Sequence, residues 1–271
     1  MKRISRYFGV FLCFILISAL VLPTNTFAAK NSYFDVSDAG EGSFSVYYAE
    51  GSSVKMKVGI TYNNSTKYYN YTHGEKASYT FSEGDGSYTL MLFRNVRGTS
   101  YAKVETKTVN VKIKNAFAPY LASTSEITFS KDDSVGKTAA ELCTNSKDAA
   151  SKVVEIHNFI AENFTYDNNF AAQITSGAVK NYTPDTNDIL KNQTGVCYDF
   201  SALFAAMCRS QEIPCVIQKG YLNGVYHAWN LVYIDGAWQA VDMTVAIAKS
   251  ADAAQFSDCL INAADGNTYK Y

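Results

Sequence analysis

The chain has 271 residues and carries 24 Lys and Arg against 25 Asp and Glu, which gives a formal net charge of -1. This balance lacks the basic excess with which nucleic-acid-binding proteins attract phosphates, so we expect no nucleic-acid partner. Hydrophobic residues make up 47% of the chain and only four residues are Pro, a composition that excludes a disordered linker protein and predicts a globular chain with a core.

Residues 1–28 have the pattern of a secretory signal peptide. Basic residues precede an apolar run over residues 7–22, and Thr26 and Ala28 place small side chains where a signal peptidase cleaves. The apolar run is shorter than the roughly 20 residues that a membrane-spanning helix needs, and no second long run follows it. We therefore expect a secreted, extracellular protein with no membrane span once the signal is removed.

Residues 33–114 alternate between apolar and polar side chains in short runs. Gly and Asn clusters interrupt these runs about every ten residues, which is typical of a small antiparallel sandwich. The clearest runs lie at residues 43–48, 54–60, 78–81, 88–93 and 108–113. A joint at residues 115–119 ends in Pro119, which cannot continue a strand. The sequence predicts a β-sandwich-like domain over residues 29–118.

Residues 119–271 change from strand-like alternation to helical spacing. Apolar residues predict an amphipathic helix over residues 149–164 and a second helix that begins near Cys197. Three strands are predicted after it, at residues 215–221, 226–234 and 237–244. Helices followed by an antiparallel sheet make an α+β domain. The predicted fold class is thus α+β, with an N-terminal antiparallel β-sandwich-like domain followed by a helix-plus-antiparallel-sheet domain.

The Asp-Gly pair at 235–236 predicts a tight two-residue hairpin between the last two strands. With that register, His227 faces Thr244 and Trp229 faces Asp242, and all four side chains share one face of the sheet. Asp242 then lies diagonally from His227, close enough for a carboxylate to meet an imidazole. A slip of one residue would move Asp242 to the other face, so this His-Asp pair depends on the tight turn.

Cys197 stands at the start of a predicted helix, directly after Gly195 and Val196. The helix dipole favours a thiolate there, and a neighbouring imidazolium would favour it further. Cys197, His227 and Asp242 together supply a nucleophile, a general acid or base, and an orienting carboxylate. The backbone N–H of Cys197 is also an available oxyanion donor. These residue types predict covalent acyl chemistry.

The mature chain contains five cysteines, namely Cys143, Cys197, Cys208, Cys215 and Cys259. Because the number is odd, at least one thiol stays unpaired or pairs outside the chain. Cysteines on apolar helix faces are usually small core residues, and we interpret Cys208 and Cys215 in this way. The partners of Cys197 favour catalysis instead.

Linked motifs over residues 150–245 carry a family resemblance. They are Gly195-Val196-Cys197-Tyr198-Asp199-Phe200-Ser201-Ala202-Leu203, Gln211-Glu212-Ile213-Pro214, Gly220-Tyr221, His227-Ala228-Trp229-Asn230 and Val241-Asp242-Met243-Thr244. The segment resembles the bacterial transglutaminase-like domain, a papain-like thiol-enzyme fold. The resemblance implies that Cys197 is the nucleophile, His227 the base and Asp242 the orienter, with no cofactor and no metal. Two departures from the family pattern bear on the substrate groove. Met243 stands where the family usually has Pro after Asp242, and Asn230 follows Trp229 where an acid two residues on is also common.

Three aromatic residues are candidates for substrate binding. Trp229 shares the predicted face of His227, and Tyr198 and Tyr182 could each offer a hydroxyl to a bound carbonyl; the alternative for each is a place in the core. We expect acyl transfer on peptide or protein amides, with cell-wall peptides among the candidates and hydrolysis favoured over cross-linking. The competing hypothesis is a non-catalytic cell-surface or adhesion module that uses the β domain for binding.

Overall fold

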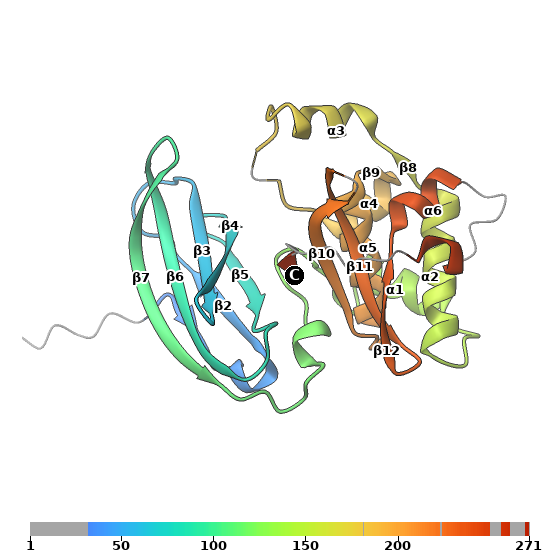
Figure 1. Cartoon of the computed structure of the whole chain (residues 1–271), viewed down its shortest axis with the longest axis horizontal. Coiled ribbons are helices and arrows are strands. Elements are labelled where there is room, and N and C mark those ends of the chain that lie inside the picture. The colour runs from blue at the N-terminus through green and yellow to red at the C-terminus, as the bar shows by residue number, and fades with distance from the viewer. Residues whose placement is uncertain (1–31, 181, 223, 250–255, 261–268, 271) are drawn as a thin grey trace, which may run out of the picture. The chain divides into compact units, whose positions relative to one another are not determined.

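The computed structural model describes residues 32–180, 182–222, 224–249, 256–260 and 269–270, so the predicted signal peptide lies outside the described residues. Two groups of elements follow one another along the chain, and each surrounds its own hydrophobic core (Figure 1). The fold class is α+β, as predicted. The domain boundary after residue 118 stays a prediction. Within the described residues no helix has the length and apolar character that crossing a membrane would require.

The N-terminal elements form two antiparallel sheets, with strand orders β1-β2-β5 and β4-β3-β6-β7. Their bounds are β1 (Phe34–Asp35), η1 (Ala39–Glu41), β2 (Ser43–Tyr47), β3 (Met56–Tyr62), β4 (Ser65–Tyr71), β5 (Lys76–Thr80), β6 (Gly86–Arg97) and β7 (Ser100–Val111). Alternate side chains point inward, such as Phe44 and Val46 in β2, because side chains in a strand have a period of two. Inward-facing residues of both sheets belong to one aromatic-rich core.

Strand β4 was not predicted from the sequence. It pairs with β3 through a turn at Asn63 and Asn64, whose φ angles are 45° and 64°. Asn tolerates this left-handed region better than most residues, which suits a tight hairpin. The first half of β4 is exposed or half-buried and polar, so the sequence lacks the alternation that marks the other strands.

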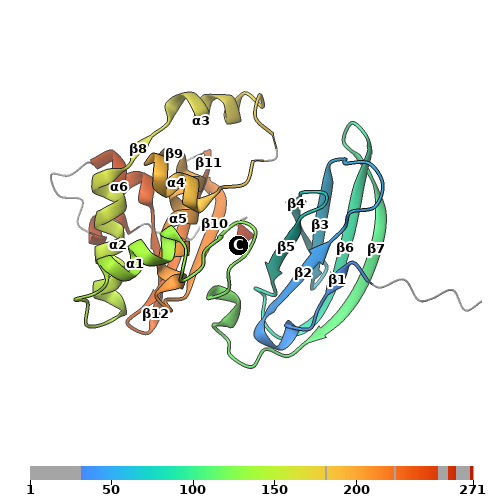
Figure 2. The same cartoon turned by 180° about the vertical axis from the view of Figure 1, so that it is seen from behind.

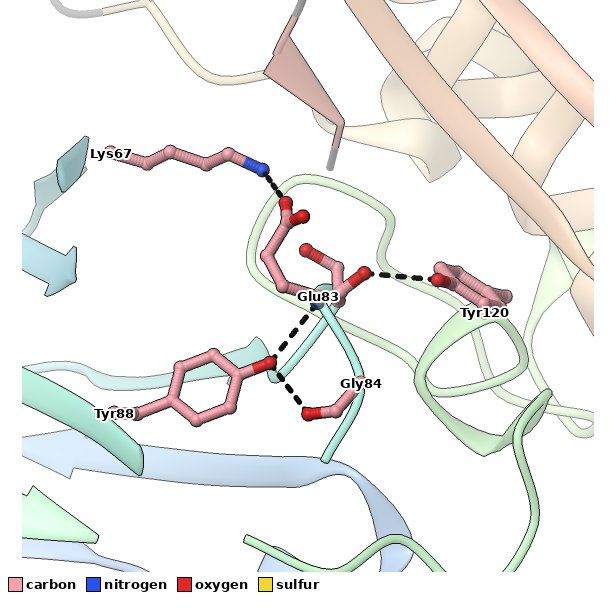
Figure 3. Close-up of polar contacts among 6 residues, drawn as sticks. Lys67, Glu83, Gly84, Tyr88 and Tyr120 are labelled. Atoms are coloured by element: carbon pink, nitrogen blue, oxygen red, sulfur yellow. Dashed lines mark hydrogen bonds and ion pairs between the residues drawn. The ribbon is translucent and has the colours of Figure 1, made fainter. Parts of the chain in front are cut away.

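Polar contacts fix the turn that leads into β6 (Figure 3). The buried Tyr88 accepts a hydrogen bond from the backbone N–H of Glu83 at 3.1 Å and donates one to the carbonyl of Gly84 at 2.8 Å. The carboxylate of Glu83 pairs with Lys67 of β4. Tyr120, which follows the predicted joint, donates to a carbonyl of the same turn at 2.9 Å. The turn therefore joins several separate segments of the chain.

The C-terminal elements pack around the central helix α5 (Cys197–Ser210). The others are η2 (Ala118–Tyr120), α1 (Ser134–Leu142), α2 (Ala149–Asn163), β8 (Thr165–Tyr166), α3 (Asn168–Thr175), α4 (Thr186–Asn192), β9 (Thr194–Gly195), β10 (Cys215–Leu222), β11 (Val225–Ile234), β12 (Ala237–Val241), α6 (Met243–Lys249), η3 (Phe256–Cys259) and β13 (Tyr269–Lys270). Helices α1, α2 and α4 contact α5, which packs against β10 and β11 (Figures 1 and 2). The sheet is antiparallel with the order β12-β11-β10-β13. The predicted helices at 149–164 and from Cys197 are confirmed as α2 and α5.

The predicted hairpin register is confirmed, because Ile234 pairs with Ala237. Asp235 and Gly236 form the turn with φ angles of 52° and 79°, so both residues adopt the left-handed conformation that a tight two-residue hairpin turn requires.

The predicted extent of the last strand was wrong. Strand β12 ends at Val241, and α6 begins at Met243 instead of the strand continuing to Thr244. The reason is a helix cap: Oδ1 of Asp242 accepts the backbone N–H of Thr244 at 2.9 Å. Thr244 therefore does not pair with His227 across the hairpin.

Candidate active site

Cys197 is the first residue of α5 and is half-buried. The preceding turn is held by Asp199, whose Oδ2 accepts the backbone N–H of Val196 at 2.9 Å. Gly195 makes this possible, because a Cβ atom there would lie 2.7 Å from Cβ of Asp199. A small backbone at residue 195 thus lets the carboxylate reach back and fix the start of the helix that presents the thiol.

His227 lies between Asp242 and Cys197. Its Nε2 hydrogen-bonds Oδ2 of Asp242 at 2.8 Å, and the two side chains are only 15% and 3% exposed. Because Nε2 is engaged with the carboxylate, Nδ1 is the nitrogen that remains for the thiol of Cys197. Burial alone would lower the pKa of His227, but its hydrogen bonds with Asp242 and Cys197 raise that pKa to about 10. An imidazolium is therefore favoured beside the sulfur at neutral pH.

The buried Asn230 fixes the strand that carries His227 against the helix that carries Cys197. Its Nδ2 donates to the carbonyl of Ser201 in α5 at 2.9 Å and to the carbonyl of Val216 in β10 at 3.3 Å. The N–H groups of this buried amide are thus satisfied by backbone carbonyls of both neighbours. Asn230 therefore sets the spacing between strand and helix, a role that sequence analysis did not assign to it.

Tyr166 is a site residue that sequence analysis missed. Strands β8 and β9 pair in parallel, which sets Tyr166 opposite Gly195, two residues before the nucleophile. Burial raises the pKa of Tyr166, and a backbone hydrogen bond from Cys197 opposes that rise, as an N–H donor does. The phenol oxygen thus lies at the N–H that we expect to bind an oxyanion. Tyr166 follows helix α2 closely in the sequence, but nothing local links it to Cys197. Only the short parallel pairing of β8 with β9 brings it to the thiol.

The three predicted substrate-binding residues lie in different surroundings. Tyr182 donates its hydroxyl to Oδ1 of Asp199 at 2.6 Å, and its ring centroid lies 6.4 Å from that of Tyr198. Trp229 is only 1% exposed, and its ring lies nearly parallel to that of His227 with centroids 6.3 Å apart. Trp229 therefore backs the imidazole from inside the protein instead of lining an open surface. Substrate binding by these three residues stays a prediction.

The other four cysteines in the described residues are buried, unlike Cys197, and all five are free thiols in the structure. Burial raises the pKa of the Cys143 and Cys208 thiols, so these two are poor nucleophiles near neutral pH. In the part of the chain that the structure describes, no group of three or more His, Cys, Asp or Glu side chains is arranged to hold a metal ion. Cys197 is thus the thiol best placed to react.

Comparison with known protein families gives a match for the part of the chain that contains the candidate site. Residues 136–243 match the family model described as the Transglutaminase-like superfamily. These residues form a transglutaminase-like domain. The match confirms the resemblance seen in the sequence, and it supports an enzyme of this kind. It also contains all three of the clustered residues Cys197, His227 and Asp242, whose catalytic roles stay a prediction.

Similar proteins include kyphoscoliosis peptidases. The chain is 29% identical over 135 residues to the one from Mus musculus, a match that covers 45% of this chain and 19% of that protein. It is 36% identical over 69 residues to the one from Homo sapiens, covering 21% of this chain and 10% of that protein. The chain therefore spans a fifth or less of the length of these curated relatives.

Two solved structures are among those to which the chain is similar. One is a candidate cysteine protease from Cytophaga hutchinsonii, with a TM-score of 0.43 and 17% identity, covering 84% of this chain and 90% of that chain. Another is a crystal structure of a TGase, with a TM-score of 0.34 and 22% identity, covering 57% of this chain and 43% of that chain.

Proposed function

We propose that the chain is a secreted cysteine-nucleophile enzyme that transfers acyl groups from peptide or protein amides, with Cys197, His227 and Asp242 as its catalytic residues. The observation that carries this proposal is the placement of the His227 imidazole, which hydrogen-bonds Asp242 at 2.8 Å and the thiol of Cys197 with its other nitrogen. A nucleophile, a proton carrier and an orienting carboxylate in this chain of contacts suit covalent acyl chemistry.

The proposed reaction follows from these contacts. The Cys197 thiolate attacks the amide carbonyl carbon, and the oxyanion that forms is stabilised by the Cys197 backbone N–H at the start of α5. His227 donates its Nδ1 proton to the leaving amine, and the C–N bond breaks to leave a thioester. A water or a second amine then loses a proton to His227 and attacks the thioester, which releases the acyl product and restores the thiolate.

Hydrolysis is the favoured outcome over cross-linking. Water reaches a thioester without a dedicated binding site, whereas cross-linking requires a groove for a second amine. The curated relatives are named peptidases, which agrees with this preference. Cell-wall peptides are one candidate substrate of a secreted enzyme with this chemistry.

The test uses the chain from residue 29 onward, recovered from the medium of an expressing cell, and a panel of labelled peptide and protein amides. Each is assayed with and without a labelled primary amine, against the Cys197→Ala variant. We expect label release that is lost in Cys197→Ala, with little label transferred to the amine. Transfer exceeding hydrolysis would reverse the preference, and equal inactivity of both proteins across the panel would favour the adhesion-module alternative. An N-terminus at Ala29 in the recovered protein would support export with signal cleavage.

A further inference from the structure

A buried lysine lies beside the candidate nucleophile and takes no part in the triad. The ammonium of Lys219, in β10, is 3.4 Å from the ring centroid of Tyr198, the residue that follows Cys197. A cation over an aromatic face is attracted to it, so the contact fixes both side chains. In β10 Lys219 pairs with Ala228, so its side chain leaves the sheet on the face opposite to that of its neighbour Gly220. The ammonium therefore lies next to the start of α5, the helix whose first residue is Cys197.

The charge of Lys219 is balanced by Glu126. Nζ of Lys219 and Oε2 of Glu126 are 3.5 Å apart, and their side chains are only 11% and 14% exposed. A strong bond between an ammonium and a carboxylate is shorter, about 2.8 Å, so the pair compensates the buried charges without a tight bond. Burying a charged lysine costs free energy, because the ammonium loses its contacts with water. Buried ionisable groups of this kind are common at functional sites, where their charge acts on a reactive group.

Burial also makes the charge effective at the thiol. Two charges within a protein interact more strongly than two exposed charges, because the surrounding dielectric is low and salt screens them less. Burial lowers the pKa of Lys219, while its attraction to Glu126 and to the Cys197 thiolate raises that pKa. Lys219 and Cys197 are therefore electrostatically coupled, in the direction in which each ion stabilises the other.

We propose that Lys219 is a positioning residue that stabilises the thiolate of Cys197, with Glu126 limiting the strength of that effect. The inference rests on the proposed role of Cys197 as nucleophile. The ammonium of Lys219 is a cation separate from the imidazolium of His227, so it forms a second source of positive charge for the sulfur. The carboxylate of Glu126 opposes it, which keeps the thiolate from becoming so stable that it is a poor nucleophile.

Other ionisable groups around the thiol belong to separate elements. His227 reaches it from β11, with Asp242 behind, and Tyr166 meets its backbone from β8. Asp199 lies one half-turn along α5 and is bonded to Tyr182. None of these groups is changed in the variants below, so their contributions cancel when each variant is compared with the wild type.

The experiment measures the rate of iodoacetamide reaction at Cys197 against pH in the folded mature chain, with Cys197→Ala as the background. We define the alkylation midpoint as the pH at which the rate is half its plateau. Lys219→Met, which keeps the length of the side chain and removes its charge, should move the midpoint up by about one pH unit. Glu126→Gln, which keeps the shape, should move it down. Lys219→Arg keeps the charge and should leave the midpoint close to that of the wild type.

Opposite shifts distinguish an electrostatic role from a packing role, because loss of packing would disturb the thiol in the same direction in both variants. Shifts of the same sign, or no shift in a folded Lys219→Met, would overturn the inference; thermal unfolding monitored by circular dichroism establishes the fold. If Lys219→Met does not fold, the sign of the Glu126→Gln shift decides alone. Alkylation needs no substrate, so this inference can fail while amide hydrolysis persists, and can hold if no amide is cleaved.

Discussion

Asp242 binds His227 with one carboxylate oxygen and caps α6 with the other. Oδ2 hydrogen-bonds Nε2 of His227 at 2.8 Å, and Oδ1 accepts the backbone N–H of Thr244 at 2.9 Å. The backbone N–H of Asp242 also donates to the carbonyl of Cys259 at 3.0 Å. A carboxylate held at both oxygens has little freedom, so the orientation of the imidazole is fixed by the start of a helix.

Asp242→Asn is expected to separate the charge of this residue from its capping role. An Asn oxygen can still accept the N–H of Thr244, so the fold should be kept. Loss of the negative charge should lower the pKa of His227, so less imidazolium is present to stabilise the thiolate, and the alkylation midpoint of Cys197 should rise. The rate of amide cleavage should fall, but by less than in Cys197→Ala. Thr244→Ala is the control, since it removes no charge and leaves the backbone N–H in place. An alkylation profile equal to that of the wild type would mean that Asp242 is not coupled to the thiol through His227.

The stability conferred by His227 should depend on pH in a definite direction. The pKa of His227 is about 10 in the folded chain, above the 6.5 of an unperturbed histidine. A group whose pKa rises on folding binds its proton more tightly when folded, so its stabilisation is complete below about pH 6.5 and is lost as pH rises toward about 10. We expect the difference in unfolding free energy between wild type and His227→Gln to be larger at pH 6 than at pH 10, measured by urea denaturation. A difference that grows with pH would contradict the assigned imidazolium.

Tyr166→Phe should slow amide cleavage with little effect on folding. The phenol oxygen lies at the backbone N–H of Cys197, where it can donate its proton to a developing oxyanion. Removing one such donor should lower kcat by on the order of 100-fold or less while KM changes little, because the interaction strengthens in the transition state. Tyr120→Phe is the control, since its hydroxyl donates to the carbonyl of Ser82, away from the thiol. An equal loss in both variants would point to a general disturbance of the fold.

Residues 31–114 should fold without the rest of the chain. Their two sheets share one core that is built within this span, including Phe44, Leu90 and Val111. A separate core is what an independent domain requires. Far-UV circular dichroism of this segment should show a β spectrum with a cooperative thermal transition. A spectrum of an unfolded chain would place the boundary elsewhere.

The sequence alone determined the parts of the site that follow from local chemistry. Asp235 and Gly236 predict the tight turn, and its register fixes which residues of β11 and β12 are opposite. The apolar spacing after Cys197 predicts the helix that presents the thiol. Turn preference and helical periodicity are properties of neighbouring residues, so a single sequence contains them.

Tertiary structure decided everything that depends on distant segments. Tyr166 and Gly195 pair over two residues only, too short a strand to leave a pattern in the sequence. Lys219 lies between Gln218 and Gly220 in β10, so no local apolar alternation predicts its burial, and its place beside Glu126 depends on how α5 and the loop before α1 pack. The end of β12 at Val241 follows from the cap that Asp242 gives to α6, where a helix start replaces strand pairing. Contacts across many residues are set by packing and burial, and these energies are distributed over the whole core instead of being encoded at any one position.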